Sequence, residues 1–254
     1  MFLGLEFPPI SHVVEWPTLF GSGPFGVNKV IILMWTSAII AFGVMYLGGR
    51  KRALVPTGVQ NIAESAVDFV EEGIVMQTMG PDGLRYTPFL ITLFTFILTC
   101  NLWGLIPAMQ MPVNARIALP VVMALLVYFT YHIAGIAAQG PLTYLKNIAF
   151  MPGVPKAMYI LLTPIELVTK FITQPLSMAV RLFANMLAGH LLLVSFAVIT
   201  AALLTASPTI VVFPFSFGLL VFLTTFEVLV AFLQAYIFTI LASVYIADAT
   251  HPAH

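Results

Sequence analysis

Charged side chains are scarce in this chain of 254 residues. Only 8% of the residues are Asp, Glu, Lys or Arg, whereas 60% are hydrophobic, and the mean hydropathy is +1.03. Soluble domains carry about 25% charged residues, so the composition excludes an ordinary water-soluble globule and predicts a polytopic membrane protein. The formal net charge is zero, which gives no electrostatic reason to expect nucleic-acid binding.

Three further absences narrow the function. The single cysteine, Cys100, lies in an apolar segment, so a disulfide within the chain is excluded. The sequence contains no G-x-x-x-x-G-K-[ST] phosphate loop and no soluble domain that could hold a nucleotide. Residues 1–26, expected to be extracytoplasmic, contain no Lys or Arg, which does not fit a cleavable signal peptide. We therefore expect the protein to handle energy only as ions crossing the membrane. We expect no cofactor, no metal and no catalytic site of its own.

Five apolar stretches are long enough for membrane-spanning helices, which need roughly 20 residues. They lie at residues 27–48, 86–107, 117–138, 158–206 and 209–248. As a helix the fourth would extend about 70 Å, more than twice the hydrocarbon thickness. Because no polar loop could return either of the last two within the membrane, we expect them to be steeply tilted and to form an antiparallel hairpin turning at residues 207–209. The whole chain is then a single integral, all-α membrane domain.

Residues 57–79 differ in kind, because apolar side chains recur there at helical spacing while acidic and amide side chains occupy the other face. This pattern predicts an amphipathic helix on the membrane surface, begun by a capping box of Thr57 and Gln60. Its acidic face suits anionic headgroups poorly, so it either contacts a protein neighbour or is simply solvated. Residues 139–156 are broken by Pro and Gly and are interpreted as a connection.

The basic side chains indicate an orientation. With the N-terminus outside, Lys29 and Arg116 face outward and six basic residues face the cytoplasm, as the positive-inside rule requires. The six are Arg50, Lys51, Arg52, Arg85, Lys146 and Lys156. The C-terminus is then cytoplasmic. The absence of a targeting peptide fits a bacterial plasma membrane, with the mitochondrial inner membrane as the alternative for an organelle-encoded copy.

A few polar side chains interrupt the two long helices. Arg181 lies near the middle of the fourth apolar stretch, with no acid among its helical neighbours three and four residues away. An arginine deep in a bilayer costs from about 3 to over 10 kcal/mol and is a functional hypothesis by default. The antiparallel hairpin places Arg181 level with Gln234, and His190 level with Glu227.

These side chains divide into two chemical groups. His190 and Glu227 can pass protons in a water-filled cavity, with Asn101 as a neutral hydrogen-bonding member. Arg181 cannot release its proton and is expected to act as a fixed positive barrier. Its counter-charge should be mobile and belong to another chain. A carboxylate about 4 Å from the guanidinium is stabilised by roughly 4 kcal/mol. This attraction is weak enough for the carboxylate to leave again.

Rotation about the helix axis adds a constraint. Four polar residues of the fourth stretch share one helical stripe, whereas His190 points the opposite way. The stripe consists of Lys170, Gln174, Arg181 and Asn185. One straight helix cannot present both Arg181 to Gln234 and His190 to Glu227, and the sequence leaves this conflict open.

Several of these residues also have purely structural explanations. Lys170 can snorkel to the membrane interface, His190 and Glu227 can form a structural tie, and Asn101 can be a satisfied interhelical hydrogen bond. Glu166 lies near the cytoplasmic end of its helix and is a candidate for lining an inner water-filled path.

Three sequence motifs resemble subunit a of F-type ATP synthases. Residues 175–190, PLSMAVRLFANMLAGH, and residues 227–238, EVLVAFLQAYIF, are similar to the two main motifs of that family. Residues 101–107, NLWGLIP, resemble its shorter motif on an earlier span. Ala184 stands where many members have Gly. The arrangement of His190 and Glu227 resembles the version found in mitochondria and many bacteria.

The resemblance implies a proton-channel stator subunit beside a rotating ring of c subunits, whose membrane carboxylates are the missing partners of Arg181. Protons would enter from outside past Asn101, His190 and Glu227 and leave through a separate cytoplasmic half-channel. Arg181 would keep the two half-channels apart. The amphipathic helix would contact the peripheral stalk, formed by b-type subunits.

A secondary proton-coupled transporter is the competing hypothesis. It would need a substrate pocket, often built from internal repeats with broken helices. The two halves of this sequence show no repeat.

Overall fold

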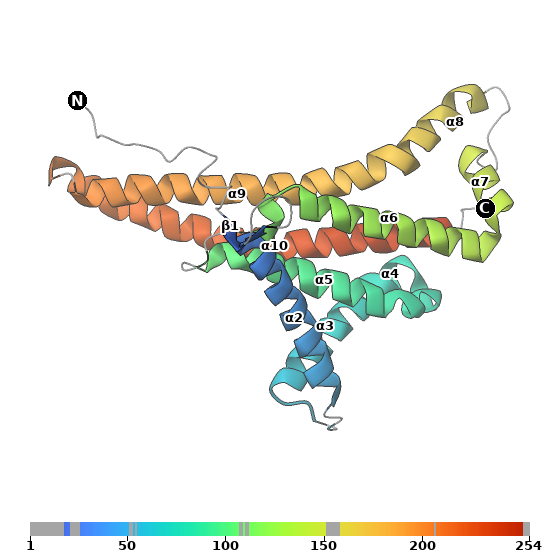
Figure 1. Ribbon diagram of the computed structural model, residues 1–254, viewed down its shortest axis with the longest axis horizontal. Coiled ribbons are helices and arrows are strands. Elements are labelled where there is room, and N and C mark those ends of the chain that lie inside the picture. Colours follow the sequence, from blue (N-terminus) through green and yellow to red (C-terminus); the bar gives the residue numbers. More distant parts are fainter. Residues whose placement is uncertain are drawn as a thin grey trace. The chain divides into compact units, whose positions relative to one another are not determined.

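The computed structural model describes residues 18–20, 26–50, 53, 55–106, 109, 112–150, 158–205 and 207–250 (Figure 1). Helices dominate this part of the chain. They are α2 (Lys29–Arg50), α3 (Val59–Val70), α4 (Met76–Thr78), α5 (Thr87–Leu102), α6 (Ala118–Gln139), α7 (Pro141–Ala149), α8 (Tyr159–Val168), α9 (Gln174–Thr205) and α10 (Phe213–Thr250). The expected all-α membrane fold is confirmed. The predicted extracytoplasmic segment 1–26 lies mostly outside the described residues.

Shorter elements join these helices. The 3-10 turns cover Gly80–Tyr86, Trp103–Leu105, Val113–Ala115 and Ser207–Val212, and the π-turns cover Glu71–Val75 (η1) and Thr169–Thr173 (η6). Two short strands, which the sequence did not predict, form an antiparallel pair: β1 (Thr18–Phe20) and β2 (Val27–Asn28).

Within the described residues, five helical segments are long and apolar enough to cross a membrane, the number expected. They are Lys29–Arg50, Gly80–Leu105, Ala118–Gln139, Tyr159–Leu204 and Ile210–Thr250. The fourth contains 46 residues, and at 1.5 Å per residue it extends about 69 Å. It does not fold back, although Pro164 lies inside α8 and a π-turn separates α8 from α9. Its steep tilt remains a prediction.

The amphipathic segment is helical from Val59 to Thr78, through α3, η1 and α4. The predicted capping box is wrong. The N-cap of α3 is Gly58, whose φ of 61° is left-handed, and no side chain caps the helix. Gln60 is buried, and its Nε2 donates to the Ala53 carbonyl at 2.9 Å and to Glu64 Oε1 at 2.7 Å. Because these acceptors engage its amide, Gln60 serves the packing of this helix and not its start.

The connection after α6 contains a helix that the sequence analysis did not anticipate. Gly140 adopts a φ of 82° and is the N-cap of α7, and Pro141 occupies the first helical position. Gln139, the last residue of α6, bonds to both α10 and α7: its Nε2 donates to the Ala249 carbonyl at 2.7 Å, and its Oε1 accepts from Asn147 Nδ2 at 2.7 Å. The Gly-Pro pair thus starts a helix in place of a loop.

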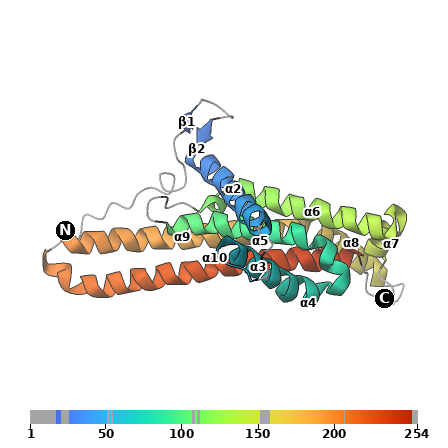
Figure 2. The ribbon, with the colours of Figure 1, turned by 90° about the horizontal axis from the view of Figure 1, so that it is seen from below.

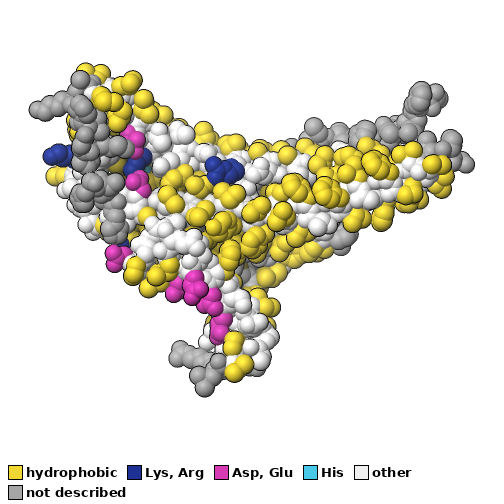
Figure 3. All heavy atoms as spheres, turned by 180° about the vertical axis from the view of Figure 1, so that it is seen from behind, with side chains coloured by type: hydrophobic (Ala, Val, Ile, Leu, Met, Phe, Trp, Pro, Cys, Tyr) yellow, Lys and Arg dark blue, Asp and Glu magenta, His cyan; other side chains and the backbone are white. Residues whose placement is uncertain are grey.

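Two compact units make up the chain. Unit 1 comprises residues 1–41, 96–116 and 183–234, and unit 2 comprises residues 42–95, 117–182 and 235–254. Hydrophobic side chains cover much of the face seen in Figure 3, and several of its acidic side chains form a row. Large apolar residues such as Phe42, Phe129 and Phe222 are more than half exposed, as expected where lipid is the solvent.

Candidate functional site

In unit 1, α9 beyond Phe183 and α10 up to Gln234 lie side by side and antiparallel (Figure 2). Asn185 Nδ2 donates to Gln234 Oε1 at 2.8 Å. Further along, the hydroxyls of Thr200 and Ser216 are 2.7 Å apart. These contacts agree with the antiparallel hairpin inferred from the sequence.

The carboxylate of Glu227 lies against the backbone of Gly189. A Cβ at position 189 would be 3.2 Å from Glu227 Oε1. Glu227 is only 6% exposed, and its Oε2 is buried with no hydrogen-bond partner among the described residues. Gly189 therefore provides the space in which this acid sits.

This geometry resolves the rotational conflict. Glu227 and Gln234, seven residues apart on α10, meet Gly189 and Asn185, which are four residues apart on α9. Both pairs lie on one face of each helix. Gln234 Oε1 thus accepts from Asn185, and Glu227 packs on the residue before His190.

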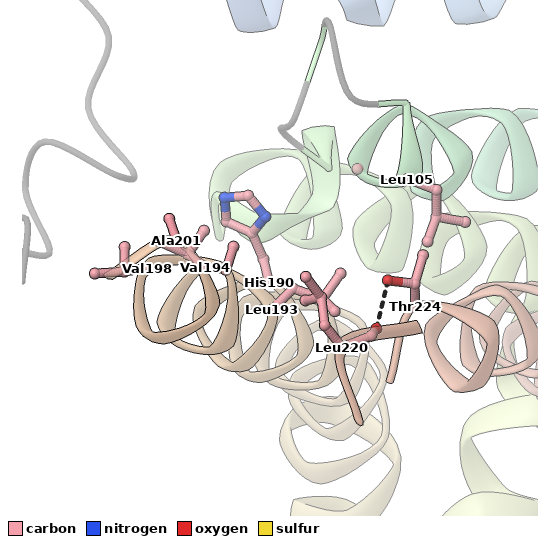
Figure 4. A pocket seen from close by; sticks show the side chains of 10 residues that line it. Leu105, His190, Leu193, Val194, Val198, Ala201, Leu220 and Thr224 are labelled. Atoms are coloured by element: carbon pink, nitrogen blue, oxygen red, sulfur yellow. Dashed lines mark hydrogen bonds between the residues drawn. The ribbon is translucent and has the colours of Figure 1, made fainter. Parts of the chain in front are cut away.

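His190 projects into a cavity of about 510 Å³ in unit 1 (Figure 4). Most side chains that line the cavity are apolar, and the imidazole is a polar group among them. Only 4% of His190 is exposed. The lining residues are Gly104, Leu105, His190, Leu193, Val194, Ala197, Val198, Ala201, Leu220 and Thr224. The hydroxyl of Thr224 donates to the Leu220 carbonyl at 2.8 Å. A cavity of this volume has room for water molecules beside the imidazole.

Asn101 makes interhelical hydrogen bonds and is not among the residues that line this cavity. Its Nδ2 donates to the Ala231 carbonyl at 3.2 Å, and its Oδ1 accepts from Asn114 Nδ2 at 2.6 Å. The residue is 2% exposed. Both polar atoms of the amide are therefore engaged in packing α5 against α10 and the Val113–Ala115 turn.

In unit 2, Lys170 is paired with acids from two helices. Its Nζ is 2.7 Å from Asp248 Oδ2 and 4.0 Å from Glu166 Oε1. The lysine side chain is 14% exposed, whereas that of Asp248 is 49% exposed. Asp248 also lines a second cavity of about 390 Å³ with Thr78, Met79, Asp82, Val244 and Ala247.

Arg181, also in unit 2, is half-buried on α9. Within the described part of the chain it makes no ion pair. Gln174, which was predicted to share a helical stripe with Arg181, is the first residue of α9. It donates its backbone N–H to the Thr169 carbonyl. The π-turn that precedes it breaks the regular rotation per residue, so the stripe cannot be extended back to Lys170.

Sequence reasoning missed several polar residues of unit 2. Asp248 was not considered, although an acid in the last turns of an apolar helix is itself a signal. Tyr144 and His132 were also missed: the Tyr144 hydroxyl lies 2.8 Å from His132 Nδ1. Burial, with added effects of Asp248 and Tyr128, raises the pKa of Tyr144 to about 12. Among the described residues, no group of three or more His, Cys, Asp or Glu could hold a metal ion.

Comparisons with known proteins agree on one family. The family model described as ATP synthase A chain matches residues 31–247. ATP synthase subunit a of Frankia alni is 40% identical over 257 residues, covering 97% of this chain and 87% of the relative. The subunit a of a Parafrankia species is 41% identical, over 91% of this chain and 79% of the relative. That of a Methylobacterium species is 37% identical, over 99% of this chain and all of the relative. A match of this length places the protein, a multi-pass membrane protein, in the ATP synthase subunit a family.

Proposed function

We propose that this protein is the proton-translocating stator subunit of a rotary F-type ATP synthase. It would offer two offset half-channels to a ring of c subunits, and Arg181 would keep them apart. The protein would bind no nucleotide, since ATP forms in a separate soluble sector. Each proton crossing 100 mV releases about 2.3 kcal/mol, so several must pass for each ATP. Family membership supports the general role, and the geometry described above supports the details.

One observation carries the proposal. The two cations in the fourth membrane segment have opposite surroundings: Lys170 lies 2.7 Å from Asp248, whereas Arg181 makes no ion pair within the described residues. A guanidinium held in a membrane needs an anion. We infer that the anion is a carboxylate of the neighbouring ring, which approaches, gives up its proton and moves on.

The outer half-channel would use the unit 1 cavity. His190 projects into it. Glu227 is the buried acid that lies against Gly189, the residue before His190. Water in the cavity would connect the imidazole to the outside, and Glu227 would pass the proton toward the ring. Asn185 and Gln234, joined by their hydrogen bond, would provide a neutral polar surface beyond Glu227.

The inner half-channel would use the acids of unit 2. Glu166 and Asp248 flank Lys170, and Asp248 opens to the 390 Å³ cavity. With the N-terminus outside, this end of α10 is cytoplasmic. The protein would lie in a bacterial plasma membrane, and its acidic amphipathic helix would contact b-type subunits of the peripheral stalk.

Replacing the proposed barrier tests this function. Arg181→Ala in the assembled ATP synthase is expected to abolish ATP-driven acidification of inverted membrane vesicles and to raise their passive proton leak. Arg85→Ala is the matched control, because Arg85 contacts the ring of Tyr86 at 4.7 Å, outside this constellation. Normal pumping by Arg181→Ala would refute the barrier role.

A further inference from the structure

The π-turn Thr169–Thr173 excludes one backbone carbonyl from the helical hydrogen-bond ladder. Here the Gln174 N–H bonds to the Thr169 carbonyl, five residues earlier, and so does not serve Lys170 in the α-helical pattern. The next nitrogen would serve Lys170 in the π-helical pattern, but it belongs to Pro175 and carries no hydrogen. Neither helical pattern provides a donor for the Lys170 carbonyl.

The hydroxyl of Tyr131 occupies this position. Tyr131 lies on α6, is 2% exposed, and donates to the Lys170 carbonyl at 2.8 Å. The ring of the next residue, His132, stacks on Phe171 with a centroid distance of 5.0 Å and an interplanar angle of 19°. Two consecutive residues of α6 therefore hold two consecutive residues of the π-turn. Since an unpaired carbonyl is costly in a membrane, the hydroxyl stabilises this turn.

The π-turn determines which way Lys170 faces. It contains one residue more than an α-helical turn, and this rotates the preceding residues by about 100° relative to those that follow. In this arrangement Lys170 Nζ reaches Asp248 at 2.7 Å. The Tyr131 ring also packs edge-on against Tyr245 of α10, at 5.9 Å between centroids.

We propose that Tyr131 is a positioning residue for the inner half-channel. Its hydroxyl replaces the donor that Pro175 lacks, holds the π-turn, and thereby sets Lys170 toward Asp248 in a fixed rotation relative to Arg181. The consequence for proton transport rests on the proposed function of the Lys170–Asp248 pair, but the positioning itself does not.

Crosslinking in the assembled enzyme tests the positioning. Lys170→Cys and Asp248→Cys are introduced together with Cys100→Ala and joined in membranes by a short bifunctional thiol reagent, and the crosslinked fraction is quantified by mass spectrometry. Tyr131→Phe removes one hydrogen bond and is expected to lower the ratio of crosslinked to free pairs by about two- to tenfold. Tyr128→Phe, on the same helix, is the control and should change this ratio little.

A double-mutant cycle with Pro175 makes the test specific. Pro175→Ala restores a backbone N–H, so the Lys170 carbonyl gains a main-chain donor. In that background Tyr131→Phe is expected to change the crosslinking ratio by less than about twofold. An equal loss in both backgrounds, or no loss in either, would overturn the proposal, because the hydroxyl would then act independently of the proline.

Two unnatural residues of similar size provide a second comparison in case Tyr131→Phe does not assemble. At position 131, 4-aminophenylalanine keeps a donor and should preserve the crosslink, whereas 4-methylphenylalanine has none and should lose it. Equal crosslinking by the two would contradict the positioning role. ATP-driven proton pumping is measured in parallel on enzymes that carry the same changes at position 131 but keep Lys170 and Asp248. A lost crosslink with normal pumping would refute the inner-path role of Lys170 and Asp248 while supporting the positioning by Tyr131.

Discussion

The carboxylate of Glu227 rests over Gly189, at a point where any other residue would place a Cβ 3.2 Å from Oε1. Real Cβ atoms rarely approach an oxygen so closely, so a side chain at position 189 must displace the acid. The buried position of Glu227 in the hairpin thus depends on residue 189 of the facing helix being a glycine.

Gly189→Ala should therefore lower the rate of ATP-driven proton pumping in inverted vesicles, because Glu227 must shift by a few tenths of an ångström. Gly189→Leu cannot be accommodated by such a shift and should lower the rate at least about tenfold. Gly218→Ala on α10 is the matched control, since a Cβ there meets nothing within 4 Å. Equal rates for Gly189→Leu and the control would show that the position of Glu227 is unimportant.

Arg181→Lys should also fail, although it keeps a cation. An ammonium can release its proton when it loses water, and it lacks the planar fork that binds a carboxylate through two hydrogen bonds. We expect less than about a tenth of the wild-type pumping rate, measured in vesicles with equal amounts of assembled enzyme. Wild-type turnover by this variant would mean that the barrier needs only a positive charge.

Asn101→Leu distinguishes packing from proton conduction. The substitution leaves the Ala231 carbonyl and the Asn114 amide without this partner, at a cost of about 1–3 kcal/mol. We expect a lower yield and a lower melting temperature of the purified complex. Thr92→Val, an exposed change on the same helix, should alter neither. Unchanged stability combined with slower pumping would instead place Asn101 in the proton path.

The Lys170–Asp248 pair should respond unequally to loss of its two members. Asp248→Asn leaves a mostly buried ammonium without its closest anion, whereas Lys170→Gln leaves a half-exposed carboxylate that water can solvate. Solvent screening limits the larger effect to roughly 1 kcal/mol. Thermal denaturation of the purified complex should rank Asp248→Asn as the less stable variant. The opposite order would show that the pair does not stabilise the lysine.

The membrane architecture was predictable because a bilayer imposes a length and an apolar composition on each spanning helix. Those two requirements identified all five segments. Local elements were harder. Gly140 and Pro141 were interpreted as helix breakers, but they form the N-cap and first residue of α7. The two residues have opposite effects at the start and in the middle of a helix, and the sequence pattern alone did not say which applied.

The pairings between α9 and α10 were predictable to about one helical turn. Matching polar side chains by depth placed Gln234 level with Arg181, one turn from its hydrogen-bond partner Asn185, and Glu227 level with His190, next to Gly189. It assigned Glu227 to His190 because a glycine offers no polar group, so Gly189 was never considered as a partner. The stripe through Lys170 failed for another reason. It assumed a constant rotation per residue, and the π-turn before Gln174 changes that rotation.

Thr200 and Ser216 bear on how the long hairpin is made. Before the two helices meet, each hydroxyl can bond only back to its own helix, whereas together they bond to each other across the hairpin at 2.7 Å. We therefore expect α9 to stay beside the membrane-insertion channel until α10 has been translated, so that the two helices enter the bilayer already bonded to each other.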